Sequence, residues 1–140
     1  MPKASKKLLD ALNEDLAYEL AALTQYMWHH VMGQGLEFPA ISSMFKDISI
    51  EEMKHAEALA ERIDLLGGVP TSQPKAIKRG GTLKKMLQED LEGENTAIAL
   101  YKQHIALAEK EKDVVTRRLL ESILGDEEGH ANDLEAVLAK

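Results

Sequence analysis

The sequence predicts an all-α protein, a four-helix bundle in which one long crossover joins two antiparallel helical hairpins. Three observations lead to this prediction. Ala, Leu, Glu and Lys dominate the chain and only 4% of its residues are aromatic, which favours helices over strands. Apolar residues recur in steps of three and four along four segments. The second half of the chain also repeats the pattern of the first half: Glu19 recurs as Glu94, 75 residues later.

The four segments are expected to form helices within a single domain that covers residues 1–140. Gly33 ends the first helix, and Pro39 suits the first turn of the second. Thr82 and Asp113 have side chains suited to the N-cap positions of the third and fourth. The predicted helices span about residues 6–32, 39–66, 82–110 and 114–138.

The connections predict the topology. Short links join the first helix to the second and the third to the fourth, so each pair is expected to be antiparallel. The link over residues 67–81 is longer and contains two prolines and four glycines. At roughly 3.3 Å per residue it reaches about 50 Å, whereas a helix of this length is about 42 Å long. The link can therefore return along the whole bundle, which makes the second and third helices parallel.

The repeat places carboxylates and imidazoles at core-facing positions. Glutamate is almost never buried without a partner, and four uncompensated carboxylates in a core would be prohibitive unless they kept protons. Two divalent cations would neutralise them, and a Glu and a His three residues apart can bind from one helix face. Mixed oxygen and nitrogen ligands suit iron or manganese, with zinc able to compete. The six candidate metal ligands are Glu19, Glu52, His55, Glu94, Glu127 and His130.

This ligand pattern is known from di-iron and di-manganese bundles, where two helices each give one Glu and two others each give Glu-x-x-His. One Glu-x-x-His is common by chance, but two of them with matching Glu residues at equal separations are specific. The competing interpretation is a bundle with buried ion pairs. No Lys or Arg stands at core-facing positions beside the six residues, which disfavours that interpretation.

Composition excludes several other classes of site. The chain has no cysteine, so it forms no disulfide and no Cys-ligated zinc or iron–sulfur centre. A net charge of −7 disfavours nucleic acid as a partner; the acidity serves solubility or attracts cations. No stretch is long enough to cross a membrane, and no apolar targeting segment follows the first residues. We therefore expect a cytoplasmic protein without a membrane partner.

Several segments resemble bacterioferritins, which are ferritin-like proteins, and the resemblance covers nearly the whole chain. The segments are residues 12–20 (LNEDLAYEL), 52–57 (EMKHAE), 66–70 (LGGVP) and 123–130 (ILGDEEGH). The resemblance implies a ferroxidase centre with two iron ions per subunit, where Fe²⁺ is oxidised by O₂ or H₂O₂ and stored as mineral in an oligomeric cage. It implies that the terminal carboxylates are Glu19 and Glu94. The bridging carboxylates would be Glu52 and Glu127, and the nitrogen ligands His55 and His130.

Met53 and Tyr26 are further candidates. In bacterioferritins the methionine at the place of Met53 ligates a haem iron on a two-fold axis, so the resemblance implies a haem shared between two subunits. The alternative is that Met53 only packs in a subunit interface. Tyr26 could donate a hydrogen bond or an electron near the metals, or serve only as a core aromatic. A second apolar stripe predicts an isologous dimer through the first two helices: Leu20, Thr24, Met27 and Val31.

The sequence also departs from the bacterioferritin pattern. Bacterioferritins usually continue into a fifth helix that helps to close a cage of 24 subunits. This sequence ends at Lys140, which favours a 12-subunit cage. Asp47 occupies a place where bacterioferritins can carry an inner-surface histidine. Glu37 and Glu51 are candidates for guiding iron, although exposed glutamates need no such role.

Two other functions compete with iron storage. The same di-metal site could serve a di-manganese catalase or a rubrerythrin-like peroxidase. A complete rubrerythrin usually adds a Cys-ligated module, which a chain without cysteine lacks. The remaining possibility is a cage or haem-binding protein without catalysis. Native mass and metal content distinguish the three.

Overall fold

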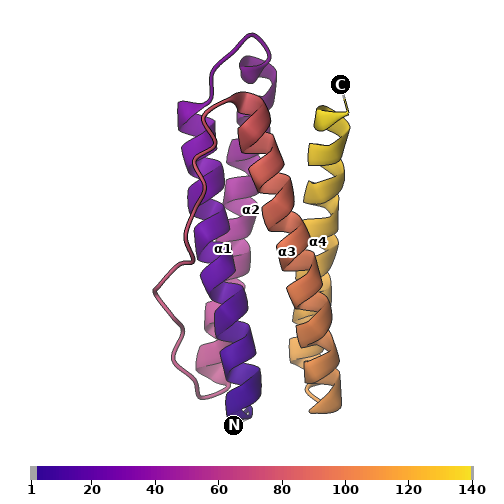
Figure 1. Ribbon diagram of the computed structural model, residues 1–140. Coiled ribbons are helices and arrows are strands. Elements are labelled where there is room, and N and C mark those ends of the chain that lie inside the picture. Colours follow the sequence, from indigo (N-terminus) through magenta and orange to yellow (C-terminus); the bar gives the residue numbers. More distant parts are fainter. Residues whose placement is uncertain (1–2, 140) are drawn as a thin grey trace.

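The computed structural model describes residues 3–139, and within them the secondary structure is entirely helical. The all-α prediction is confirmed, as are the two antiparallel hairpins and the crossover between them (Figure 1). α2 begins one residue before the expected Pro39. The helices are α1 (Lys6–Met32), α2 (Phe38–Leu65), α3 (Leu83–Lys110) and α4 (Val114–Leu138).

Side-chain caps fix where three of the helices begin. The Ser5 hydroxyl accepts a hydrogen bond from the Leu8 N–H at 3.0 Å and starts α1. Thr82 starts α3 in the same way, as predicted. The Asp113 carboxylate caps α4, also as predicted. α2 has no side-chain cap, and Pro39 occupies its first turn, where the missing N–H costs nothing.

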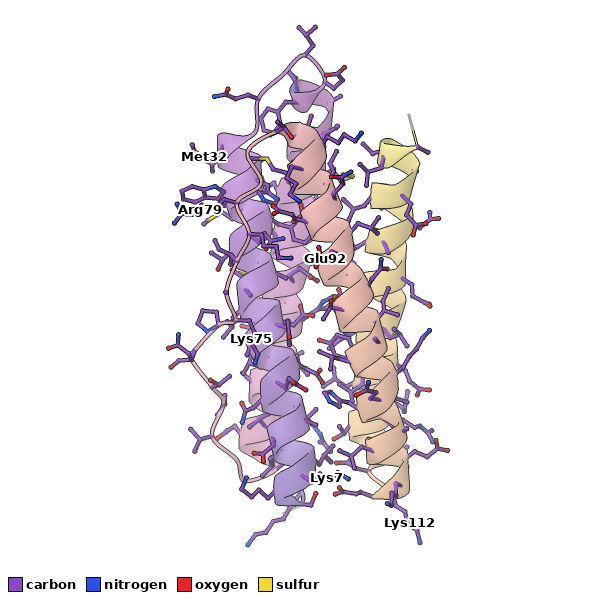
Figure 2. All side chains as sticks on the ribbon, in the orientation of Figure 1. Lys7, Met32, Lys75, Arg79, Glu92 and Lys112 are labelled. Carbon is purple, nitrogen blue, oxygen red and sulfur yellow. The ribbon has the colours of Figure 1, made fainter. Side chains whose placement is uncertain are left out.

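The crossover runs along α1 and is attached to it at several points (Figure 1). Near its start, the Asn13 side chain donates to the Val69 carbonyl at 3.1 Å and accepts from the Thr71 N–H at 2.8 Å. Further on, cationic side chains of the crossover lie over aromatic rings of α1 (Figure 2). Lys75 Nζ is 5.4 Å from the Tyr18 ring centroid. The crossover is therefore a fixed strap, and α2 and α3 are parallel as predicted.

The apolar core has two parts, one at each end of the bundle. Leu12, Leu59 and Leu120 belong to the part near the start of α1. Phe45 and Leu134 belong to the part near its end. The six candidate metal ligands lie between the two parts along every helix. No helix within residues 3–139 has the length and apolar character needed to cross a membrane.

Candidate metal centre

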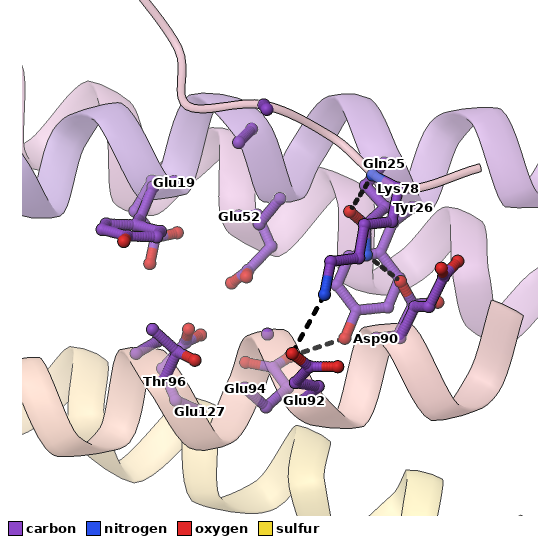
Figure 3. A pocket seen from close by; sticks show the side chains of 17 residues that line it. Glu19, Gln25, Tyr26, Glu52, Lys78, Asp90, Glu92, Glu94, Thr96 and Glu127 are labelled. Atoms are coloured by element: carbon purple, nitrogen blue, oxygen red, sulfur yellow. Dashed lines mark hydrogen bonds and ion pairs between the residues drawn. The ribbon is translucent and has the colours of Figure 1, made fainter. Parts of the chain in front are cut away.

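The four helices bring the six candidate ligands together in the middle of the bundle. All six are buried, with at most 6% of each residue exposed. They form two overlapping groups, and within each group one potential ligand atom per residue lies within 4.8 Å of all the others. Figure 3 shows four of the carboxylates facing one another across the bundle. The groups are Glu19, Glu52, His55 and Glu127, and Glu52, Glu94, Glu127 and His130.

Glu52 and Glu127 belong to both groups, which is the arrangement that bridging carboxylates require. Glu19 and Glu94 each belong to one group, which suits terminal ligands. That these residues bind metal stays a prediction. The structure shows that the backbone places them where two ions a short distance apart would each meet three carboxylates and one imidazole.

The two histidines present the same nitrogen to the centre. His55 Nδ1 is 3.0 Å from Glu52 Oε1, and its Nε2 points away and lies 2.8 Å from Asp126 Oδ2. His130 Nδ1 is 3.1 Å from Glu94 Oε2, and its Nε2 bonds the Glu51 carboxylate. When Nε2–H donates to such a carboxylate, the Nδ1 lone pair is left for a metal.

Glu51 and Asp126 were not predicted in this orienting role. The sequence indicated Glu51 only as a residue that could guide iron, and Asp126 not at all. Both lie off the core-facing row, where an apolar period gives no signal. The signal that could have found them is the repeat itself, because they are 75 residues apart like the ligands they orient.

Two tyrosines hold the terminal carboxylates from across the bundle. The Tyr26 hydroxyl donates to Glu94 Oε2 at 2.7 Å, and the Tyr101 hydroxyl donates to Glu19 Oε1 at 2.8 Å. Burial raises the pKa of both phenols well above the ordinary value, so both stay protonated and act as donors. Tyr26 thus lies beside the centre as expected, and Tyr101 makes the equivalent contact in the other half.

Two histidine–aspartate pairs also join α1 to α3. His29 Nδ1 is 2.8 Å from Asp90 Oδ2, and His104 Nδ1 is 2.8 Å from Asp15 Oδ1. Burial raises the pKa of Asp15 to about 6. Burial alone would lower the pKa of His104, but its bond to Asp15 outweighs this and raises it. The role of His104 was missed, although it too lies 75 residues after its counterpart His29.

Burial makes the carboxylates of the centre hold protons when no cation is present. Desolvation is the main cause that raises the pKa of Glu19 to about 7 and that of Glu94 to about 8. Desolvation and three neighbouring carboxylates raise the pKa of Glu52 well above its ordinary value. Glu127 goes the other way: burial opposes the shift, but the imidazoles of His55 and His130, each with its Nδ1 3.4 Å from Glu127 Oε1, lower its pKa.

The imidazoles are the positive partners of these carboxylates. Burial alone would lower the pKa of His55 and of His130. The neighbouring carboxylates of Glu127 and Glu19 for the first, and of Glu127 and Glu94 for the second, raise the pKa of each to about 11. A cation entering the centre must therefore displace protons.

Two buried carboxylate oxygens of the candidate ligands have no hydrogen-bond donor. They are Glu19 Oε2 and Glu127 Oε1. Each lies within 3.4 Å of His55 Nδ1 without forming a hydrogen bond. A buried oxygen without a donor is costly, and a metal ion would supply the missing partner. The residues present therefore fit a pair of divalent ions.

Known proteins with similar sequences belong to a family of four-helix metal-binding bundles. Residues 9–140 match the family of ferritin-like domains. Over 137 residues the chain is 35% identical to a bacterioferritin from Brucella melitensis, covering 97% of this chain and 85% of the relative. The chain belongs to the bacterioferritin family. The resemblance found in the sequence is therefore confirmed.

Solved structures of other proteins have the same fold as this chain. A ferritin-like di-iron-carboxylate protein from Bacillus anthracis has a TM-score of 0.92 at 30% identity, over 95% of this chain and 96% of the other. The Rhodobacter capsulatus bacterioferritin, described with a metal-free dinuclear site and a haem iron, has a TM-score of 0.89 at 31% identity. That likeness covers 98% of this chain and 86% of the other.

The predicted haem ligand lies outside the centre. Met53 is on α2 and is 52% exposed, pointing away from the buried Glu52 beside it. Half of the apolar stripe of α1 is exposed as well, with Met27 at 48% and Val31 at 67%, whereas Leu20 and Thr24 are half-buried. Glu37 and Asp47 are both exposed and are not among the residues of the two candidate metal groups.

Proposed function

We propose that this bacterioferritin stores iron and oxidises Fe²⁺ at a di-iron ferroxidase centre formed by the six buried residues. The observation that carries the proposal is the sharing of Glu52 and Glu127 between the two four-residue groups. Two ions held this way would sit close enough to react with one molecule of O₂ or H₂O₂. Iron at the centre supplies the electrons for reducing that oxidant.

The chain's own residues would prepare the centre for this reaction. Tyr101 and Tyr26 hold the terminal carboxylates in place by hydrogen bonds. Asp126 and Glu51 fix the ring orientation of the two histidines. Burial excludes bulk water and strengthens the attraction between carboxylates and cations. The protons held by the metal-free centre leave as Fe²⁺ binds.

The test compares the ligands with an exposed neighbour. Glu94→Ala combined with His130→Ala removes two ligands of one group. We expect iron binding to fall from two ions per chain towards one, with loss of the fast phase of Fe²⁺ oxidation. Glu128→Ala, an exposed position beside Glu127, is the matched control and should change neither. Fast oxidation that survives the double substitution would reject the six-residue centre.

The other metal chemistry has a distinct signature. A di-manganese catalase or a rubrerythrin-like peroxidase would use the same six residues. Purified protein holding two Mn per chain and releasing O₂ from H₂O₂, without building up an iron mineral, would replace the storage proposal. Mineralisation of added Fe²⁺ inside a large particle supports storage.

We further propose that haem binds at a two-fold dimer interface, with Met53 of each subunit as axial ligand. The proposal is supported by the exposed Met53, by the exposed Met27 and Val31 of α1, and by the haem iron described for the Rhodobacter capsulatus relative. Met53→Leu should abolish the Soret band of haem-reconstituted protein, whereas Met27→Leu should keep it. Unchanged haem content in Met53→Leu would leave Met53 as a packing residue.

The assembly and location remain predictions as well. A cage built from such dimers is expected, and light scattering on metal-loaded protein separates 12 subunits from 24. A cytoplasmic location is expected from the sequence and is tested by fractionating cells.

A further inference from the structure

A cavity reaches the candidate centre from the face of the bundle that the crossover covers. Its volume is about 190 Å³, and it lies between α1 and α3 (Figure 3). Glu52, Glu94 and Glu127 of the centre line it at depth. Ala76 and Lys78 of the crossover line it as well, so the strap forms part of its wall. A small ion arriving through this cavity would meet the carboxylates directly.

The charges around the cavity are almost all negative. Beyond the candidate ligands, Glu89, Asp90 and Glu92 line it, and one buried oxygen of Glu89 has no hydrogen-bond donor. Among the described residues of its wall, Lys78 is the only basic one. Lys78 Nζ bonds Glu92 Oε1 on α3 at 2.9 Å, so this single positive charge bridges crossover and helix.

The backbone of Lys78 is fixed while its side chain is not. The Lys78 N–H donates to Gln25 Oε1 at 2.8 Å, and its carbonyl accepts from His29 Nε2 at 3.0 Å. The side chain is 53% exposed and that of Glu92 is 65% exposed. An ion pair this exposed to water is weak and opens readily. The contacts thus combine a rigid anchor with a movable charged end.

We propose that the Lys78–Glu92 ion pair is a latch over this cavity and sets the rate at which a divalent cation reaches the centre. The proposal rests on the proposed metal-binding function. With the latch closed, the ammonium group stands in the path and repels an incoming cation. With the latch open, Glu92 is free to attract the cation from solution.

The test measures cobalt binding to the metal-free protein, because the visible bands of Co²⁺ report carboxylate and imidazole ligation without iron oxidation. Lys78→Met keeps the length of the side chain and removes its charge. We expect it to raise the association rate constant roughly threefold or more. The dissociation rate constant should rise by the same factor, which leaves the Kd unchanged, because Lys78 touches none of the candidate ligands. The difference should shrink at high salt.

Two further variants make the result specific. Lys84→Met removes the same charge from an exposed position at the start of α3, but Lys84 does not line the cavity, so association should remain as in the unsubstituted protein. Gly93 lines the cavity on α3, and a Cβ placed there would meet nothing within 4 Å. Gly93→Met should extend a side chain over the cavity and slow cobalt binding.

Several outcomes would overturn the latch. They are an unchanged rate in Lys78→Met, an equal acceleration in Lys84→Met, and a changed Kd without parallel changes in both rates. In any of these cases cobalt still binds and the proposed function stands. If the unsubstituted protein binds no cobalt at the six residues, the proposed function itself is rejected, and the latch with it.

Discussion

The two histidine–aspartate pairs between α1 and α3 occupy equivalent places in the repeat but have different surroundings. His29 and Asp90 are fully enclosed, and the Lys78 carbonyl accepts a hydrogen bond from His29 Nε2. His104 faces a groove instead, with its Nε2 3.5 Å from the half-exposed Glu14. The repeat supplies both pairs, but the chain has one crossover, which covers only the first.

The repeat determines the contacts near the candidate centre but not the access to it. Contacts close to the candidate centre come in matched pairs, such as Tyr26 with Glu94 and Tyr101 with Glu19. Access to the centre is not matched, because the cavity that reaches it is bounded by the crossover. The chemistry is therefore shared between the halves, and the approach to it belongs to one side.

Removing either histidine tests whether the crossover makes one histidine–aspartate pair more important for stability than the other. His29→Ala leaves Asp90 fully enclosed without its partner, and we expect a loss of about 3–5 kcal/mol in the free energy of unfolding. His104→Ala should cost less, about 1.5–3 kcal/mol, because water from the groove can reach Asp15. Denaturant unfolding of the metal-free protein measures both. Equal losses would show that the crossover does not distinguish the pairs.

The next effect concerns the orienting carboxylates. Asp126→Ala and Glu51→Ala each remove the acceptor for a histidine N–H, and each should weaken cobalt binding at its own half of the centre by about 10–100-fold. Calorimetric titration gives both affinities. Asp126→Asn keeps an acceptor oxygen and should retain most of the affinity. If only one of the two alanine variants weakens cobalt binding, the two halves do not depend equally on their orienting carboxylates.

The pH dependence tests whether both halves of the centre hold protons. The folded pKa values of Glu19 and Glu94 are about 7 and 8 against an ordinary 4.5, and those of His55 and His130 are about 11 against 6.5. Every one of these groups binds its proton more tightly when folded. Their contribution to stability is complete at low pH and is lost as pH rises through this range.

The metal-free protein should therefore lose at least about 2.7 kcal/mol of unfolding free energy per pH unit between pH 7 and 9, because each of the two histidines contributes about 1.4. Thermal or denaturant unfolding at several pH values measures this slope. Bound Zn²⁺ should reduce the slope, since it displaces the protons. Glu19→Gln should reduce the slope mainly near pH 7 and Glu94→Gln mainly near pH 8, and a reduction by only one of them would contradict equivalent halves.

The smallest effect separates the two tyrosines. Tyr26→Phe and Tyr101→Phe each remove one hydrogen bond to a terminal carboxylate and should cost about 1 kcal/mol in stability. Tyr26 lines the cavity, whereas Tyr101 is not among its lining residues. Both substitutions should slow the single-turnover oxidation of Fe²⁺, and Tyr26→Phe should slow it more. Equal slowing by both would restrict Tyr26 to positioning Glu94.

The helices and the six candidate ligands could be predicted because both follow from one-dimensional patterns. A helical period places Glu52 and His55 on one face, and the repeat places Glu127 and His130 in the matching position. Met53 could be placed off that face for the same reason, and it is exposed in the structure.

The contacts outside the core-facing rows could not be predicted in this way. Asp126 and Glu51 are partly exposed, and nothing in an apolar period marks a surface carboxylate as a histidine partner. The course of the crossover along α1 could not be predicted from the sequence either. Its glycines and prolines indicate a link, but single polar side chains of α1, such as Asn13 and Gln25, fix its path.

Both candidate metal groups draw residues from both hairpins, so neither hairpin can form either group alone. Folding must dock the two hairpins before a metal ion finds its full set of ligands. A bound ion then stabilises the docked hairpins but cannot initiate their docking. Removing the ion should speed amide hydrogen exchange along α1 and α3 together, because the two helices face each other across the centre. The metal content of the protein would thus set how often its two halves come apart.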